Sequence, residues 1–365
     1  MPLPAHQDVD LPVVLHIVSY DVSRGAERYA RALVDALNRG GDVRHLLMTM
    51  FEGDEAGLGA DLALEVPRGV FRRLGLDPRV VTRLRNAFRT LQPQAIVAHG
   101  GEPAKYAALA SGRGIPFAYL VIGSSHPLLG NPLRRKMRDF YVDRAAAVVA
   151  VSSAIADEMR ALGVPDSEVH VIPNGRDPKV YEAAGHTDRE TPRVLFIGHL
   201  DEQKRPLLFV SLISEIKRRG VEAFGVMVGG GPLHDEVVAR AHLDGIEVLG
   251  PRDDVPALLA GADLLVMTSR PPEGMPGVLI EAGMAGVAVV TTDVPGARDV
   301  VVDGVTGLVV GVDDEIGLAD AVERLLRDGT LRSGMGMAAR ERCVAEFSLD
   351  VSAGAWIEIL EGITS

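Results

Sequence analysis

Two glutamates, Glu273 and Glu281, stand eight residues apart on either side of a segment suited to binding an anion. The segment between them follows an apolar run and opens a helical pattern, in which Pro276 suits the first turn because its missing N–H is not needed there. The backbone amides that follow Pro276 are then expected to point at a negatively charged group. Carboxylates accept hydrogen bonds from paired hydroxyls, which ribose and hexose offer. A phosphate flanked by hydroxyls at both ends describes a nucleotide-sugar.

Two other turns carry cations or glycines at the end of an apolar run. Lys204 and Arg205 come just before or at the start of the next helical pattern. Two cations beside helix N–H groups can neutralise a diphosphate, although a solvated basic turn would show the same residues. The triplet Gly229 to Gly231 lets a backbone approach a ligand without a Cβ clash, but a tight turn explains it better. It lacks the Gly-Lys-Ser/Thr ending of a P-loop, so an ATPase of that kind is not expected.

Apolar runs of strand length recur along the chain, each followed by a turn and a helical pattern. They are near-continuous in Val, Ile, Leu and Ala rather than alternating, which indicates strands buried on both faces of parallel sheets. Because the strand–helix alternation occurs twice, the sequence predicts an α/β protein with two doubly wound, Rossmann-like domains; a single eight-stranded barrel is the competing architecture. The predicted strands are 13–20, 43–50, 95–99, 117–122, 146–152, 169–172, 193–198, 223–228, 246–249, 262–269, 287–292 and 307–310.

The predicted boundary between the two domains lies in residues 183–192, a polar stretch punctuated by glycine and proline. Such a composition is typical of an interdomain linker. The chain has 365 residues, which suits two domains of about 150–200 residues each. We therefore expect an N-terminal domain over 1–187 and a C-terminal domain over 188–347. Residues 348–365 carry a helical apolar face that needs a surface to pack on.

Charge and composition narrow the class of protein. The net charge of −12 argues against a general nucleic-acid binder. Residues 188–365 hold 16 Lys/Arg and 29 Asp/Glu, against 22 and 21 in residues 1–187, so the two halves are expected to meet different partners. No apolar run is long enough to span a bilayer, and the N-terminal residues lack a signal-peptide pattern. With one cysteine, Cys343, and ten scattered histidines, we expect a cytoplasmic protein without a metal centre.

The motif around Glu273 and Glu281 resembles the E-x7-E signature of the family-4 retaining glycosyltransferases, which have the two-domain GT-B fold. The likeness covers nearly the whole chain and is strongest after residue 190. It rests on residues 25–43, the Pro-Asn-Gly turn at 173–175, and residues 193–206, 248–269 and 273–310. The resemblance implies two Rossmann-like domains that face each other across a cleft. It places the nucleotide-sugar donor in the C-terminal domain and the acceptor in the N-terminal domain, to which residues 348–365 return.

The resemblance also implies roles for individual residues. Glu281 would hold the ribose hydroxyls of the donor, Glu273 would lie near the hydroxyls of the donor sugar, and Lys204 would bind the diphosphate and stabilise its leaving charge. His126 resembles the histidine that faces the transferred sugar, with a structural role as the alternative. The implied catalytic residues are His126, Lys204 and Glu273. The implied donor-binding residues are Gly25, His199, Lys204, Arg205, Gly230, Arg252, Glu273, Gly274, Met275, Pro276, Gly277, Val278, Leu279 and Glu281.

One position departs from the family pattern. His199 stands where the family usually has an arginine directly after the glycine. Neutral histidine is a poorer partner for a diphosphate than bidentate arginine. Either Arg205 or a protonated His199 compensates, or the donor site is weaker than usual in the family. Arg252 lies where the family tends to contact the base.

The implied reaction moves a sugar from a UDP-sugar, or alternatively a GDP-sugar, to an acceptor hydroxyl with retention of configuration. No metal or other cofactor is expected, because GT-B enzymes generally need none. A nucleotide-sugar epimerase of the same fold and a non-catalytic GT-B binding module are the alternatives. The E-x7-E resemblance disfavours the epimerase, and the intact Glu273, Glu281 and Lys204 disfavour the binding module.

The acceptor is a carbohydrate, a lipid-linked molecule or a small molecule, and it is expected at the first domain. Residues 68–89 hold seven arginines interleaved with apolar residues, and residues 133–140 add four cationic side chains. A basic amphipathic stretch of this kind is typical of peripheral contact with an anionic membrane surface. A pair of helices with solvated arginines is the plainer interpretation.

Overall fold

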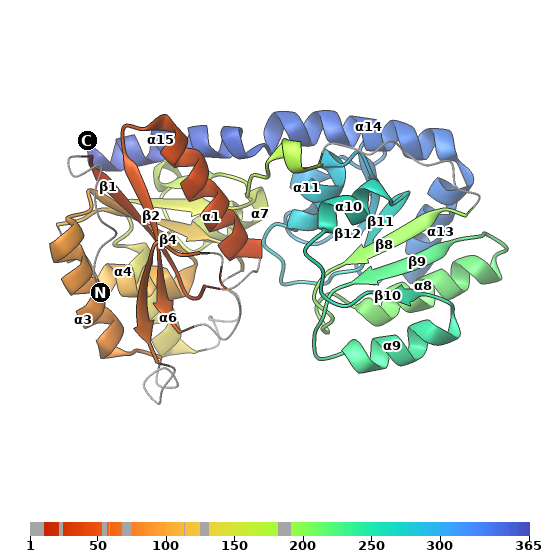
Figure 1. Cartoon of the computed structure of the whole chain (residues 1–365), viewed down its shortest axis with the longest axis horizontal. Helices are drawn as coiled ribbons and strands as arrows, with labels where there is room; N and C mark the ends of the chain where they lie inside the picture. Colours follow the sequence, from red (N-terminus) through yellow and green to blue (C-terminus); the bar gives the residue numbers. More distant parts are fainter. Residues whose placement is uncertain are drawn as a thin grey trace. The chain divides into compact units, whose positions relative to one another are not determined.

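The computed structural model describes residues 11–21, 25–52, 57, 59–67, 75–112, 114–124, 131–181 and 191–365. The chain forms two compact units, Met1–Gly175 with Leu349–Ser365, and Arg176–Ser348. Each unit contains one sheet flanked by helices (Figure 1). The boundary expected between residues 187 and 188 lies outside the described residues. The structure groups Arg176 with the second unit, where its amide donates to the carbonyl of Phe347 at 3.0 Å.

Seven parallel strands form the sheet of the first unit. They are β1 (Val13–Val18), β2 (Arg44–Phe51), β3 (Leu62–Val66), β4 (Ala95–His99), β5 (Phe117–Val121), β6 (Ala147–Ala150) and β7 (Val169–Val171). Their order is β3-β2-β1-β4-β5-β6-β7, so the direction of strand addition reverses between β1 and β4. Every residue of β4, β5 and β6 is buried, as expected for strands covered on both faces.

Six helices pack around this sheet in the described part of the unit. They are α1 (Gly25–Leu37), α3 (Pro78–Leu91), α4 (Gly101–Ala110), α6 (Pro132–Val142), α7 (Ser153–Ala161) and α15 (Leu349–Thr364), with 3-10 turns at Asn38–Gly40 and Asp166–Glu168. The side chains of Asp77 and Asn131 cap α3 and α6 by accepting hydrogen bonds from first-turn amides. Helix α15, from the end of the chain, packs on α1, where the buried indole of Trp356 donates to the Tyr29 hydroxyl at 3.0 Å.

The second unit has a six-stranded parallel sheet. Its strands are β8 (Arg193–Ile197), β9 (Phe224–Val228), β10 (Glu247–Val248), β11 (Leu264–Met267), β12 (Ala288–Thr292) and β13 (Gly307–Val310). Their order is β10-β9-β8-β11-β12-β13, and the direction reverses between β8 and β11. In open parallel sheets such a reversal marks the edge where ligands bind, because the loops after the two strands diverge to opposite faces.

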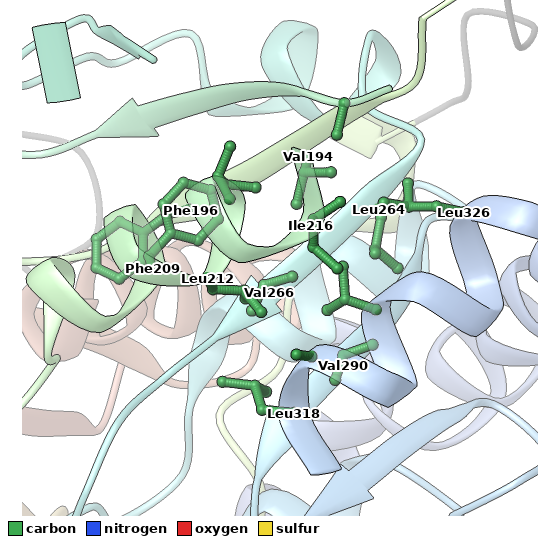
Figure 2. Close-up of a cluster of buried hydrophobic side chains, with 14 of the residues drawn as sticks. Val194, Phe196, Phe209, Leu212, Ile216, Leu264, Val266, Val290, Leu318 and Leu326 are labelled. Carbon is green, nitrogen blue, oxygen red and sulfur yellow. The ribbon is translucent and has the colours of Figure 1, made fainter. Parts of the chain in front are cut away.

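Helices and a dense apolar core hold this second sheet. The helices are α8 (Pro206–Arg218), α9 (His234–Leu243), α10 (Val255–Ala260), α11 (Gly277–Met284), α12 (Ala297–Val300), α13 (Glu315–Arg327) and α14 (Gly329–Glu346), with a 3-10 turn at Pro178–Tyr181. Phe196 of β8 meets Phe209 of α8, and Leu318 of α13 joins the same buried cluster (Figure 2). This packing fixes the strand ends from which the loops of the candidate site emerge.

All twelve predicted strands are present, with ends shifted by no more than two residues. The sequence does not predict β3, because Leu62, Ala63 and Leu64 lie at the sheet edge and are only partly buried. Two open sheets exclude the eight-stranded barrel. Within the described residues, no helix combines the length and the apolar character that crossing a bilayer requires.

Candidate functional site

Lys204 and Glu273 lie in the two loops that diverge at the reversal point of the second sheet. The loop from β8 to α8 contains Lys204, and the loop from β11 to α11 contains Glu273. The two sequence segments predicted to bind the donor therefore meet at one sheet edge, as expected for a ligand site in a doubly wound domain.

The ammonium group of Lys204 donates a hydrogen bond to Oε1 of Glu273. Both side chains are largely shielded from solvent, with 25% of Lys204 and 10% of Glu273 exposed. Shielded charges need partners, because an unpaired charge in such a position loses its solvation without compensation. The Lys204 amide is held in turn by Oδ1 of Asp201 at 2.9 Å. A ligand that offers a phosphate to the ammonium and hydroxyls to the carboxylate can replace this internal pair.

Thr268 fixes the turn that presents Lys204. Its fully buried hydroxyl donates a shared hydrogen bond to the carbonyl oxygens of Lys204, at 2.7 Å, and Arg205, at 3.0 Å. Arg205 has a φ of 50°, a left-handed conformation that costs a non-glycine residue about 1–2 kcal/mol and that Thr268 helps to maintain. The sequence does not single out Thr268, because a threonine at the end of an apolar strand carries no chemical signal of its own.

Helix α11 begins at Gly277, so Pro276 is its N-cap rather than its first-turn residue. The amide of Leu279 donates to the carbonyl of Pro276 at 3.1 Å. The Leu279 amide therefore already has an acceptor within this turn, and its contact with a ligand stays a prediction. For Gly277 and Val278, at the first two positions of the helix, the ligand-facing role stays a prediction.

Gly296 supports the loop that precedes α11. It has a φ of 76°, and a Cβ there would lie 2.3 Å from the carbonyl oxygen of Gly274 and 3.0 Å from the Cα of Met275. Backbone contact this close needs a glycine. The predicted donor-binding residues Gly274 and Met275 are thus buttressed by a neighbouring turn and buried.

Glu281, in the second turn of α11, pairs with Arg176. Nε of Arg176 donates to Oε1 of Glu281 at 2.9 Å, and only 15% and 18% of the two side chains are exposed. Arg176 directly follows the Pro-Asn-Gly turn at 173–175. The sequence does not assign Arg176 to the site, because 105 residues separate it from Glu281 and no spacing connects them.

The other three predicted diphosphate or base contacts are placed differently from Lys204. Arg205 is engaged by the first residue of α13, with Nη2 lying 3.3 Å from Oε1 of Glu315. Arg252 pairs with Asp254, which raises the pKa of the guanidinium, and 44% of its side chain is exposed. His199 is exposed, two residues after the end of β8. Donor contacts for these three residues stay predictions.

Glycines in the triplet after β9 allow two backbones to pack closely. Gly229 has a φ of 141°, and a Cβ there would lie 1.8 Å from the carbonyl oxygen of Gly198. A Cβ on Gly231 would lie 2.5 Å from the carbonyl oxygen of Leu200. The carbonyl of Gly230 accepts a hydrogen bond from the Leu200 amide at 2.9 Å. The triplet therefore supports the loop that carries Lys204, and a direct ligand contact by Gly230 stays a prediction.

Two predicted site residues belong to the first unit. Gly25 is the exposed first residue of α1, and a Cβ there would meet no heavy atom within 4 Å, so the local fold does not demand a glycine. His126 lies outside the described residues.

In the second unit, Cys343 is buried in α14, and burial raises the pKa of its thiol to about 12. The described His, Cys, Asp and Glu side chains include no group of three or more arranged to hold a metal ion.

Two family matches cover the chain in succession. Residues 23–180 match the family described as Glycosyltransferase Family 4, and residues 191–328 match the one described as Glycosyl transferases group 1. The chain belongs to glycosyltransferase family 4. The family resemblance inferred from the motifs is thus confirmed.

Individual relatives agree with this family. N-acetyl-α-D-glucosaminyl L-malate synthase of Bacillus anthracis is 30% identical over 239 residues, which are 62% of this chain and 61% of the relative. α-D-kanosaminyltransferase of Streptomyces kanamyceticus is 29% identical over 264 residues, or 65% and 68% of the two chains. The chain therefore spans less than two thirds of the Bacillus relative that it matches.

The fold is shared with solved glycosyltransferase structures. The crystal structure of Anabaena HepE in complex with UDP superposes with a TM-score of 0.80 at 19% identity, covering 96% of this chain and 100% of the other. At this identity the likeness concerns the fold alone. The chain has the GT-B fold, which confirms the fold predicted from the sequence.

Proposed function

We propose that this chain is a retaining glycosyltransferase that moves a sugar from a nucleoside-diphosphate sugar to an acceptor hydroxyl. The observation that carries the proposal is the Lys204–Glu273 pair at the edge where β8 and β11 diverge. Membership of family 4 supports the reaction class. The UDP held by Anabaena HepE favours a UDP-linked donor, and a GDP-linked donor is the alternative.

In the proposed donor complex, the diphosphate lies beside Lys204 and the first amides of α11. Lys204 then exchanges its bond to Glu273 for one to a phosphate oxygen, which frees the carboxylate of Glu273 to accept hydrogen bonds from sugar hydroxyls. Glu281 accepts hydrogen bonds from the ribose. Negative charge grows on the phosphate as its bond to the anomeric carbon breaks, so Lys204 stabilises the transition state more than the ground state.

The acceptor hydroxyl attacks the anomeric carbon from the face of the departing phosphate, so the configuration is retained. The leaving phosphate oxygen takes the proton of that hydroxyl, and Lys204 lowers the cost of the charge. His126 is proposed to face the transferred sugar, and Gly25 to lie near the phosphates. Because Lys204 and the α11 amides supply the positive charge, this scheme needs no metal or other cofactor.

The acceptor is assigned to the first unit, and helix α6 is proposed to contact an anionic membrane surface. In the first turns of α6, Leu133 is 72% exposed, and Arg134, Arg135 and Lys136 are exposed beside it. Phe140, one turn further on, is 39% exposed. Apolar and cationic side chains on one exposed helix suit the interface of an anionic bilayer.

The other basic stretch, 68–89, supports a membrane contact less well. Residues 68–74 lie outside the described residues. In α3, Arg83 donates to the carbonyl of Glu65 at 2.8 Å, and Arg85 donates to the carbonyl of Leu109 at 3.0 Å. These arginines serve contacts within the first unit.

One experiment separates transfer from the two alternatives. Nucleotide-sugars are screened by thermal shift, and the strongest hit is assayed for release of the nucleoside diphosphate with and without candidate acceptors. A transferase releases the diphosphate in step with glycosylation of the acceptor, whereas an epimerase releases it together with free sugar and without any acceptor. A binding module shows a thermal shift and no release. Glu281→Ala is the control and should lose both the shift and the release; a variant as active as the wild type would contradict the assignment of this site.

A further inference from the structure

The Arg176–Glu281 pair has a geometry that a simple surface ion pair lacks. The arginine uses Nε to bind Oε1 of Glu281, and both side chains are more than four-fifths shielded. In the described part of the chain, the side-chain hydrogen bond of Glu281 is the one from Arg176, accepted through Oε1, and its backbone carbonyl accepts from the Ala285 amide. The second carboxylate oxygen, Oε2, is therefore left for a ligand.

Gly277 makes room for the arginine. A Cβ added at Gly277 would lie 2.3 Å from Nη2 of Arg176 and 3.8 Å from Oε1 of Glu281. The guanidinium thus lies directly on the first turn of α11, and any side chain at Gly277 would displace it. A glycine at position 277 is therefore required by the packing of Arg176, apart from any approach of a phosphate.

A cation at this end of a helix needs compensation. The N-terminus of a helix carries a partial positive charge, so the helix dipole alone disfavours a guanidinium beside Gly277. The carboxylate of Glu281 offsets that repulsion. The guanidinium orients the carboxylate in turn, because a planar guanidinium binds carboxylate oxygens in a fixed direction. The main chain of Arg176 is anchored separately, since its amide donates to the carbonyl of Phe347 at 3.0 Å.

From these contacts we infer that Arg176 is a positioning residue, which holds Oε1 of Glu281 so that Oε2 faces the ribose hydroxyls of the donor nucleotide. The inference rests on the proposed function, in which Glu281 binds the ribose. Arg176 itself is not required to touch the nucleotide. Its loss should therefore weaken recognition of the ribose hydroxyls and leave the remaining contacts of the nucleotide in place.

The test measures binding of UDP and GDP, each beside its 2′-deoxy counterpart, by calorimetry to the full chain. The wild type is expected to bind the preferred ribonucleotide about tenfold more tightly than the 2′-deoxy form, because the deoxy form lacks one of the two ribose hydroxyls that donate to Glu281. Arg176→Met should lower the affinity for the ribonucleotide toward that for the deoxy form. The affinity for the deoxy form should change little. Gly277→Ala, which displaces the guanidinium, should act in the same direction.

A control variant removes another Arg–Glu ion pair of the second unit, one that lies within a single helix. Arg327 donates to Glu323 at 2.8 Å on α13, so Arg327→Met should leave both affinities unchanged. If Arg176→Met weakens the ribo and deoxy forms equally, or keeps the wild-type ratio, Arg176 has only a structural role and the inference is overturned. Absence of binding of all four nucleotides to the wild type would instead overturn the proposed function, and with it this inference.

Discussion

Lys204 and Glu273 are 69 residues apart in the chain, yet their charged groups form an ion pair between the loops that follow two adjacent strands. In the proposed donor complex, the pair places a cation for the phosphate beside a carboxylate for the sugar. Its members come from opposite sides of the strand-order reversal, which is why the topology of the sheet brings them together.

Replacing Lys204 tests the charge that this pair supplies. Lys204→Met should lower kcat by about 10²–10³-fold, because the transition state loses a preorganised cation, while the donor Kd rises far less. Steady-state rates of diphosphate release, together with donor titrations, measure the two effects. Lys217→Met is the control, since Lys217 in α8 bonds the carbonyl of Asp244 and should keep full activity. An unchanged kcat in Lys204→Met would show that Lys204 does not stabilise the transition state.

The packing of the glycine turn against the β8 loop gives a stability prediction. Gly229→Ala should lower the free energy of unfolding of the second unit by about 3 kcal/mol, because φ is 141° and the new Cβ would overlap the Gly198 carbonyl. Gly334→Ala is the matched control. It lies within α14, where a Cβ meets no atom within 4 Å, and it should stabilise by up to about 1 kcal/mol. Calorimetry would contradict this account if the two variants melted alike.

The sequence predicts the strands and the edge of the site because both rest on local patterns. Buried parallel strands leave continuous apolar runs, and Lys204, Glu273 and Glu281 stand in short segments whose composition indicates ligand binding. The pairing of Arg176 with Glu281 cannot be predicted in this way, because it joins segments 105 residues apart. The edge strand β3 is also missed, because one-sided burial leaves a weaker apolar pattern.

Helix α6 yields a prediction about membranes. The protein should sediment with anionic liposomes at low salt and not with neutral ones, and binding should weaken at high salt. Exchanging Arg134 and Arg135 for glutamate should reduce the partition coefficient by at least about 30-fold, since each lost basic residue contributes about 1 kcal/mol and about 1.4 kcal/mol is a factor of ten. Leu243→Ser is the control, because Leu243 is 83% exposed on the second unit and its removal should change nothing. Equal sedimentation with neutral and anionic liposomes would rule out the proposed contact.

Three histidines form a buried chain across the sheet of the first unit. His16 in β1 lies 3.1 Å from His99 in β4 through Nδ1, and 3.1 Å from His45 in β2 through Nε2. A neutral imidazole has one N–H, so His16 donates one of these bonds and accepts the other. Burial lowers the pKa of His45 to about 4 and that of His99 to about 3. Burial, with the charges of His99, His45 and Arg31, holds the pKa of His16 well below its usual value.

Because these three histidines are buried and neutral, we expect the first unit to lose stability in mild acid. In the unfolded chain all three histidines take up protons near pH 6.5, whereas the folded chain resists protonation until about pH 4 and below. The stabilisation is therefore complete above pH 6.5 and falls as the pH drops, by about 1.4 kcal/mol per pH unit for each histidine. Urea titrations followed by the fluorescence of Trp356, the single tryptophan and a buried residue of α15, report on this unit.

Removing the central histidine tests the origin of that pH dependence. His16→Leu should be less stable than the wild type at pH 7.5, because His45 and His99 each lose a hydrogen-bond partner. Its stability should nevertheless fall less steeply between pH 6.5 and 4.5, because two histidines of this cluster rather than three then gain a proton on unfolding. His242→Leu, at an exposed position in the second unit, is the control and should keep the wild-type slope. An identical slope in His16→Leu and the wild type would mean that groups other than this chain set the acid limit.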